Sequence, residues 1–262
     1  MTGARMIDAS AWVGSWPFGS GRHEALRELA TLLRGVGIGG AMVSPIRAVL
    51  GPETTSPNRE LLDAIVGWDD PDVAIWLAPI VDPTFPGWQR DLADLLDTAG
   101  EHIRAVRIVP SYHGFALDDA PIDRLAEVLI ARDLPLIVQV RMLDERAHPP
   151  LMKVSPVPIA AIVALAERHA ALRIVVAGVF FAELSALAII ERVAIELSAV
   201  EADATLPRVL ELIAVDRVLL GTHAPLHDPL PGVVKANGPG IAQVDQAAVA
   251  GENARRWFRL PV

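Results

Sequence analysis

The sequence predicts an α/β protein folded as a single (β/α)8 barrel of the TIM type. Short strand-like runs alternate with longer amphipathic segments along nearly the whole chain. Eight such alternations within about 250 residues are what this barrel requires. Several runs are apolar throughout, which is typical of parallel strands covered by helices on both faces. An open, doubly wound sheet is the alternative.

Eight segments have the character expected of the strands. They are Met6–Ala11, Gly40–Ser44, Ala74–Val81, Ala105–Val109, Leu136–Val140, Arg173–Ala177, Ala194–Ser198 and Arg217–Gly221. Two of them read "PLIVQV" and "RIVVAG", which are apolar on both faces apart from one glutamine and one arginine. We therefore expect buried parallel strands at these places.

The segments between the strands have helical periodicity. The first, 23–37, places four leucines on one face, namely Leu26, Leu29, Leu32 and Leu33. We expect it to stop at Gly35 or Gly37. The segment 121–135 follows Asp118 or Asp119 as its candidate N-cap. The segments 156–172 and 204–216 repeat the pattern, whereas helix and strand are hard to separate after Phe180.

Composition excludes several classes of function. The net charge is −9 and the pI about 5.2, which argues against nucleic-acid binding because phosphate contacts need basic patches. The absence of cysteine excludes disulfides, thiolate metal sites and a cysteine nucleophile, and it fits a cytoplasmic location. Charged residues interrupt the most apolar region, Ile159–Leu197, so we expect no membrane span. With no linker or repeat, we expect one domain over residues 1–262.

The carboxyl ends of barrel strands form the active face, so the polar residues there are the site candidates. After the first strand, Ser10 and Trp12 share a face with Asp8. The nearby aromatics Trp12, Trp16 and Phe18 favour a hydrophobic plug over the barrel mouth rather than a wall for substrate. After the fourth strand, Tyr112 and His113 form either an acid–base pair or a backbone-bonded loop.

The fifth strand ends in the densest polar stretch of the chain. Gln139 and Arg141 share a face, and Asp144 and His148 follow in a loop. An arginine fork is a common device for holding a carboxylate, although a solvated, salt-bridged loop has the same composition. At the eighth strand His223 lies nearest the strand end, and we expect His227 and Asp228 to face solvent.

The order of the strand ends resembles the amidohydrolase-related superfamily of metal-dependent hydrolases and decarboxylases. The resemblance rests on "MIDASAWVG", "RIVPSYHGFALDD", "LPLIVQVRMLDER", "RVLLGTHAP" and the closing "GENARRWFRL". It implies a barrel whose first strand carries His-x-His, whose fifth and sixth strands carry histidines and whose eighth carries an aspartate. Here the matching positions hold other residues, namely Ser10, Trp12, Gln139, Ala177 or Gly178, and His223.

The sequence thus predicts a branch of the superfamily with a degenerate metal site. Zinc at a catalytic site needs three protein donors from His, Asp or Glu, and Trp12 and Gly178 supply none. We therefore expect no cofactor and a hydrolase or related lyase acting on a small, carboxylate-bearing molecule. His113 or His223 is the expected base, Tyr112 the oxyanion donor and Arg141 the carboxylate anchor. The other expected substrate-binding residues are Ser10, Trp12, Gln139, Asp144 and His148.

Two alternatives stay open at this stage. One is a divalent metal such as zinc at a relocated site, whose ligands would be His113, His148, His223 and Asp144 or Asp228. The other is a non-catalytic binding protein that keeps the fold, since fold alone does not fix function. Substrate identity and oligomeric state are not readable from the sequence.

Overall fold

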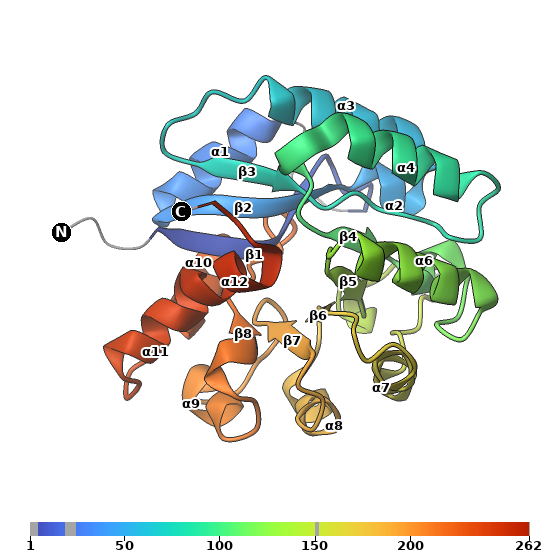
Figure 1. The fold of residues 1–262 in the computed structure, drawn as a ribbon. Coiled ribbons are helices and arrows are strands. Elements are labelled where there is room, and N and C mark those ends of the chain that lie inside the picture. Colours follow the sequence, from blue (N-terminus) through green and yellow to red (C-terminus); the bar gives the residue numbers. More distant parts are fainter. Residues whose placement is uncertain (1–4, 19–24, 150–151, 262) are drawn as a thin grey trace.

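Eight parallel strands form the centre of the molecule in two ladders, β1–β3 and β4–β8 (Figure 1). The computed structural model describes residues 5–18, 25–149 and 152–261. The strands are β1 (Met6–Val13), β2 (Ile38–Pro45), β3 (Ala74–Leu77), β4 (Val106–Ile108), β5 (Leu136–Gln139), β6 (Ile174–Ala177), β7 (Val193–Glu196) and β8 (Val218–Leu219). Each of them overlaps a segment predicted from the sequence.

Backbone hydrogen bonds link the two ladders at both edges. Between β3 and β4, the Arg107 amide donates to the Pro79 carbonyl at 2.8 Å. Between β8 and β1, the Ala9 amide donates to the Leu220 carbonyl and the His223 amide donates to the Ser10 carbonyl, both at 2.8 Å. The strands therefore surround a common interior, and the predicted (β/α)8 barrel of the TIM type is confirmed.

Helices surround the strands (Figure 1). They are α1 (Leu26–Gly35), α2 (Arg47–Leu50), α3 (Thr55–Val66), α4 (Trp88–Ala99), α5 (Pro110–His113), α6 (Ala120–Ala131), α7 (Ile159–Arg168), α8 (Leu184–Leu187), α9 (Thr205–Leu210), α10 (Pro229–Ala236), α11 (Gln243–Ala247) and α12 (Asn253–Phe258). A π-helical turn, Ala248–Glu252, joins α11 to α12, and 3-10 turns include Gly100–His102, Glu145–Ala147, Phe181–Glu183 and Val215–Arg217.

The helix predictions hold with shorter boundaries. In α1, Leu26, Leu29 and Leu33 are buried as predicted, Leu32 is half-buried, and the helix ends at Gly35. The start predicted at residues 23–24 lies outside the described residues. Asp119, which is one of the two predicted positions, is the N-cap of α6. In the unit after Phe180, the helical part consists of the 3-10 turn Phe181–Glu183 and the single turn α8, which are too short to show a helical period.

Apolar side chains fill the barrel in layers. The lower layer packs strand side chains against α12, and its large members are Ile7, Met42, Trp76, Ile137 and Phe258. The upper layer lies at the carboxyl ends of the strands and contains Trp12, Trp16, Ile46, Val49, Ile80, Val109 and Met142. The predicted aromatic plug is therefore present, except that the Phe18 side chain is 53% exposed at its edge.

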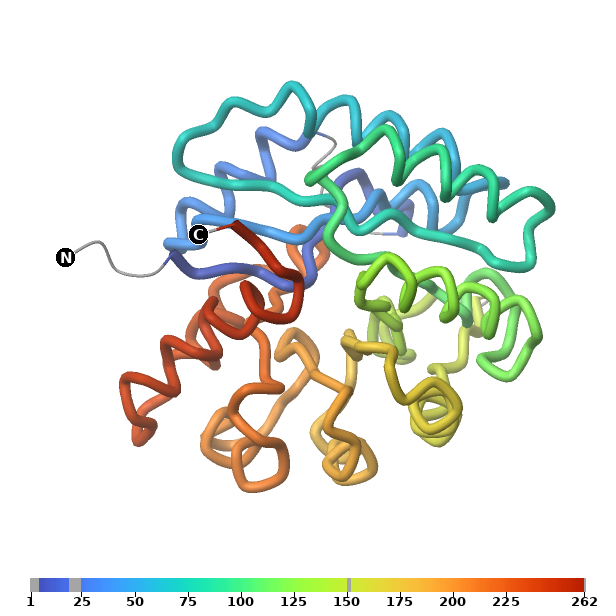
Figure 2. Tube along the Cα trace, viewed as in Figure 1, coloured from blue at the N-terminus to red at the C-terminus, as the bar shows by residue number. Residues whose placement is uncertain are grey.

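The two ends of the described chain meet on one side of the barrel. In Figure 2 the red C-terminal segment runs beside the blue first strand. The Arg255 guanidinium donates to the Arg5 carbonyl at 3.2 Å, which ties α12 to the start of β1. Within the described ranges, none of the helices combines the length and apolar character needed to span a bilayer.

We predict that Gly221→Ala strongly destabilises the protein. A methyl group at Gly221 would lie 1.8 Å from Glu196 Oε2, and Glu196 is fully buried and fixed by three hydrogen bonds. Overpacking of this kind lowers the free energy of unfolding by about 3 kcal/mol. Urea denaturation measures the loss. The matched control is Gly35→Ala, where no atom lies within 4 Å, and an equal loss in both variants would contradict the steric argument.

Candidate active site

A buried arginine lies at the centre of the polar network. The Arg107 side chain is fully buried and extends from β4 into the upper part of the barrel. Its Nη1 donates to Gln139 Oε1 at 2.5 Å and to Ser10 Oγ at 3.2 Å. Its guanidinium carbon lies 4.3 Å from the centre of the Trp12 ring, in cation–π contact. One side chain thus joins β1, β4 and β5.

Two buried carboxylates face this cation. Asp8 Oδ1 accepts hydrogen bonds from the amides of Ser10 and Thr222, at 2.9 and 3.0 Å, and Oδ2 bonds the Thr222 hydroxyl. Burial raises the pKa of Asp8 to about 6, against these hydrogen bonds and with a smaller contribution from Glu196. Burial likewise lowers the pKa of Arg107 to about 10, while Glu196 and Asp8 act to raise it.

Glu196 organises the neighbouring strand ends. Its Oε1 accepts from the Gly178 amide and from the Ser198 hydroxyl, both at 2.7 Å. Its Oε2 accepts from the Ser198 amide at 2.6 Å. A carboxylate with three donors satisfies most of its acceptor sites, so Glu196 is a structural anchor for β6 and β7.

Trp12 fixes the protonation state of His223. The indole Nε1 donates to His223 Nδ1 at 3.0 Å, and an indole N–H is a donor only. Nδ1 must therefore be unprotonated, and the neutral ring carries its hydrogen on Nε2. Nε2 is buried and makes no hydrogen bond of full geometry to a described residue, although the Met142 backbone lies near enough to favour the protonated ring. The sequence suggested a base at this position, but this geometry leaves a neutral N–H donor.

The surroundings of His223 reinforce the neutral form. Burial lowers the pKa of His223 well below its ordinary value of 6.5, and His227 and Arg107 lower it further, while the Met142 backbone acts in the opposite direction. The residue has a positive φ of 61°, a conformation that few residues other than glycine adopt. Such local strain is found most often where a side chain has a functional orientation to keep.

A cavity of about 190 Å³ opens beside His223. Its lining comes from the segments that follow β5 to β8, and it consists of Arg141, Met142, Leu143, Asp144, Gly178, Phe180, Ser198, Ala199, Glu201, His223 and His227. Its position is the active face that the barrel predicts.

His227 belongs to this cavity, which corrects the expectation that it faces solvent. It is half-buried, and its ring centre lies 5.1 Å from that of His223. Burial lowers the pKa of His227, and the charges of Glu196 and Lys235 act in opposite directions. Asp228 is exposed as expected, and its carboxylate accepts from the Leu230 amide at the start of α10.

The guanidinium of Arg141 is already paired within the chain. It donates to both carboxylate oxygens of Glu183, at 2.8 and 2.5 Å, and to the Gly178 carbonyl at 2.6 Å. Its face lies 3.8 Å from the Phe180 ring centre. Only Nε is buried without a partner. The fork expected to anchor a substrate carboxylate therefore holds Glu183, and Nε–H is what Arg141 still offers.

The other predicted residues divide into two groups. Asp144 lines the cavity, but Arg146 occupies both its oxygens, and those hydrogen bonds hold the pKa of Asp144 far below its usual range. Tyr112 and His148 contact each other at 3.3 Å, and burial raises the pKa of Tyr112 to about 12. His113 Nε2 lies 2.9 Å from the Ala48 carbonyl, and burial lowers its pKa. The last three do not line the cavity.

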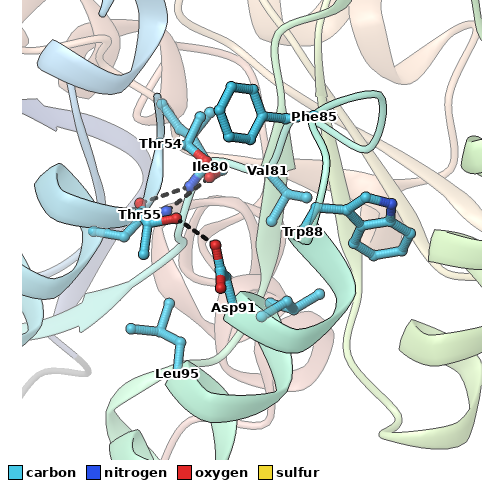
Figure 3. Close-up of a pocket in the computed structure, with 10 residues that line it drawn as sticks. Thr54, Thr55, Ile80, Val81, Phe85, Trp88, Asp91 and Leu95 are labelled. Carbon is cyan, nitrogen blue, oxygen red and sulfur yellow. Dashed lines mark hydrogen bonds between the residues drawn. The ribbon is translucent and has the colours of Figure 1, made fainter. Parts of the chain in front are cut away.

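A second hollow lies outside the barrel, between α3, α4 and the end of β3 (Figure 3). The space that it encloses is about 20 Å³, roughly enough for one water molecule. Thr55 donates to Asp91 at 3.0 Å, as Figure 3 shows. Asn58 bonds both backbone groups of Ile80, at 2.7 and 2.9 Å. These polar groups bond one another and hold α3 to its neighbours, so this hollow carries no chemistry.

Sequence reasoning missed three residues of the site. Arg107, Glu196 and Ser198 were not expected there, and all three are buried. A signal was present for two of them, because each charge interrupts an otherwise apolar strand, in "AVRIV" and "VAIEL". A buried charge in a strand needs a partner, and that need is the observation that finds such residues.

Comparisons with known proteins agree with this architecture. A family model described as amidohydrolase matches residues 50–260. The structure is similar to 5-carboxyvanillate decarboxylase from Sphingomonas paucimobilis, with a TM-score of 0.75, 16% identity, and coverage of 98% of this chain and 99% of that one. An amidohydrolase from Burkholderia multivorans has a TM-score of 0.71 and 19% identity, over 98% of this chain and 100% of that one. Among curated proteins none matches.

Two of the similar structures hold manganese. One of them is 5-carboxyvanillate decarboxylase from Novosphingobium aromaticivorans, complexed with manganese and 4-hydroxy-3-methoxy-5-nitrobenzoic acid. Its TM-score is 0.74 and its identity 15%, with coverage of 98% of this chain and 97% of that one. At these identities the likeness shows the fold alone.

The strand-end side chains of this chain do not fit a divalent metal. Ser10 Oγ and Gln139 Oε1 accept from Arg107, whose positive charge would repel a metal ion there. His223 Nδ1 accepts from Trp12, whose indole has no lone pair to give. Across residues 5–18, 25–149 and 152–261, no three His, Asp or Glu side chains are grouped to hold a metal. The relocated zinc site is not assembled among them either.

We predict that His223 stays neutral, with its proton on Nε2, from pH 7.5 to well below pH 6.5. The unfolded chain protonates this residue near pH 6.5, so the unfolded state binds more protons below that pH. The contribution of His223 to the free energy of unfolding therefore falls as the solution is acidified. Imidazole ¹⁵N shifts measured across this range report the state, with His223→Gln assigning the signal. A midpoint at or above pH 6.5 would contradict the assignment.

Proposed function

Because the chain belongs to the amidohydrolase family, we propose that it is a hydrolase or lyase that acts on a small, carboxylate-bearing molecule without a divalent metal. The cavity beside His223 is the proposed site.

One observation carries the proposal: two residues that line the cavity each hold a buried N–H group without a hydrogen-bond partner among the described residues. His223 Nε2 and Arg141 Nε are both buried without partners, and both residues line the cavity. Leaving a buried donor unpaired costs about 1–3 kcal/mol. Each of these groups can donate and neither can accept, so the missing partner is an acceptor. A carboxylate supplies two acceptor oxygens and the negative charge that suits a guanidinium.

The two histidines have complementary roles in this proposal. His223, held neutral by Trp12, donates Nε2–H to an oxygen of the substrate. His227 is half-buried beside it, and burial lowers its pKa, so it is neutral at pH 7 and free to take up a proton. Hydrolysis would use His227 to remove a proton from the attacking water, and decarboxylation would use its protonated form to return one to carbon.

The lining also limits the kind of molecule that fits. Met142, Leu143 and Phe180 add apolar surface to the lining. The structurally similar decarboxylases are named for carboxylated aromatic rings, and one holds a nitrobenzoic acid. An aromatic carboxylic acid combines a flat apolar body with the required charge, and we propose this class as the first to test.

A binding protein without turnover is the second candidate. It is favoured by the pairing of the fixed charges on the cavity wall: Arg141 pairs with Glu183, Asp144 with Arg146, and Glu201 with Lys235 at 2.6 Å. A side chain held in an ion pair keeps its charge, so it can help to position a ligand but does not transfer protons. Under this reading the two histidines recognise the carboxylate and do nothing further.

We predict that histidine substitutions separate these two functions. His223→Gln and His227→Gln should each lower turnover by about 100-fold or more, because each removes a donor or a proton carrier from the reacting atoms. Product formation and CO2 release from a panel of aromatic acids, esters and amides provide the measurement. The control is His102→Gln, a histidine in the 3-10 turn before β4, at the opposite end of the barrel.

Unchanged turnover in both histidine variants would remove the enzymatic proposal. Specific binding without any turnover across the whole panel would leave the binding protein as the function. His102→Gln should match the wild type in either case.

We also predict that binding depends on the ligand's negative charge. 4-Hydroxy-3-methoxy-5-nitrobenzoic acid should bind with a dissociation constant at least roughly tenfold lower than that of its methyl ester, since a charge-assisted hydrogen bond contributes about 1.5–3 kcal/mol. Isothermal titration calorimetry measures both. Equal affinities for the acid and the ester would show that the unpaired donors do not recognise a carboxylate. Affinities for both ligands that His223→Gln leaves unchanged would show the same.

A further inference from the structure

Arg107 joins the positions at which the resembling family carries metal ligands. It donates to Ser10 Oγ and to Gln139 Oε1, and it stacks on Trp12. Trp12 in turn donates to His223. Four strand-end positions on β1, β5 and the segment after β8 are therefore connected through one buried cation.

Two buried carboxylates compensate the positive charge of Arg107. Asp8 and Glu196 are both fully buried, and both stabilise the charged form of Arg107. Within the described part of the chain, Arg107 forms no direct ion pair with any carboxylate, so this attraction acts across the interior, where screening by water is weak. A buried carboxylate without a compensating positive charge is strongly destabilising. The upper layer therefore needs a positive charge to compensate these carboxylates.

We propose that the Arg107 guanidinium is the internal cation of this barrel, a built-in replacement for a divalent metal, and that the wild-type barrel binds no such ion. The guanidinium occupies the acceptor atoms of Ser10 and Gln139 and supplies the positive charge that Asp8 and Glu196 require. It also keeps the Trp12 ring in place through stacking, and thereby positions the indole N–H on His223. Arg107 is thus a positioning residue that touches no cavity atom.

This inference shares with the proposed function the absence of a divalent metal, but it holds for an enzyme and for a binding protein alike. An experiment can therefore contradict this inference and leave the proposed function intact. The histidine variants test turnover, whereas the experiments below measure metal binding and stability and need no substrate.

The first experiment adds manganese or zinc to the chelator-treated wild-type protein. Calorimetry and elemental analysis after dialysis should find no stoichiometric ion, and the melting temperature should not rise. One equivalent of either metal bound with a higher melting temperature overturns the proposal.

The second experiment is a double-mutant cycle. Arg107→Met should lower the melting temperature by roughly 10 °C, because it leaves buried carboxylates uncompensated. Asp8→Asn is the matched partner, since its amide keeps the two backbone hydrogen bonds on Oδ1 and can donate to the Thr222 hydroxyl. In the Arg107→Met background Asp8→Asn should recover part of the loss. Arg107→Lys, which keeps the charge, should lose less than Arg107→Met.

The control is Arg217→Met combined with Asp8→Asn. Arg217 is also buried, but its guanidinium donates to backbone carbonyls of Ala188, Ile190 and neighbouring residues. Asp8→Asn should therefore give no recovery there. If Arg107→Met does not fold alone, folded protein from the double variant counts as recovery. Absence of recovery in the Arg107 background, or equal recovery in the Arg217 background, overturns the proposal.

Discussion

The hydrogen bonds from Arg107 to Ser10 and Gln139 are the interaction on which the rest of the site depends. They connect strands of both ladders, β1 of the first with β4 and β5 of the second. A guanidinium with fixed N–H directions holds its acceptors in one plane, which a flexible ammonium does not. The upper layer of this barrel is therefore organised by a polar centre, although apolar side chains surround it.

A chain of consequences leads from that centre to the cavity. The guanidinium stacks on Trp12, and the oriented indole donates to His223. The donation removes one protonation state and one tautomer of His223, so the ring presents N–H at Nε2. The protonation state of a cavity-lining residue is thus set by Arg107, which contacts it through one intervening side chain, Trp12. A change at Arg107 would reach His223 without altering any residue that lines the cavity.

Sequence periodicity was sufficient for the fold and for the side of the barrel that carries the site. Apolar runs such as "PLIVQV" identify strands because burial on both faces leaves few polar positions, and strand order then locates the carboxyl ends. His223 and Arg141 were found in this way, and both line the cavity. The aromatic plug was predicted from the cluster of Trp12, Trp16 and Phe18 just after the first strand.

The pairing of charges could not be predicted in the same way. Arg141 meets Glu183, 42 residues later, after an intervening helix and strand, and no local pattern announces that contact. Arg107 belongs to a strand only three residues long, which is too short for alternation to show which face it occupies. His227 was assigned to solvent because it follows a strand end by several residues, whereas the turn at His223 brings the two rings together. Long-range contacts and turn geometry, rather than propensity, decide these positions.

The unpaired donors give the strongest argument that this cavity is used. Several buried polar groups nearby are well paired: Asn58 satisfies both backbone groups of Ile80, and Glu196 accepts three hydrogen bonds. Nitrogens of Trp16, Arg104, Arg107 and His113 are also buried without partners, but none of these four residues lines the cavity. At His223 the chain instead spends one ring nitrogen on Trp12 and leaves the other without a partner, in a backbone conformation of positive φ. A residue that served only to fill space would be apolar at lower free energy. An unpaired, oriented and neutral N–H beside a cavity is what recognition of an incoming acceptor requires.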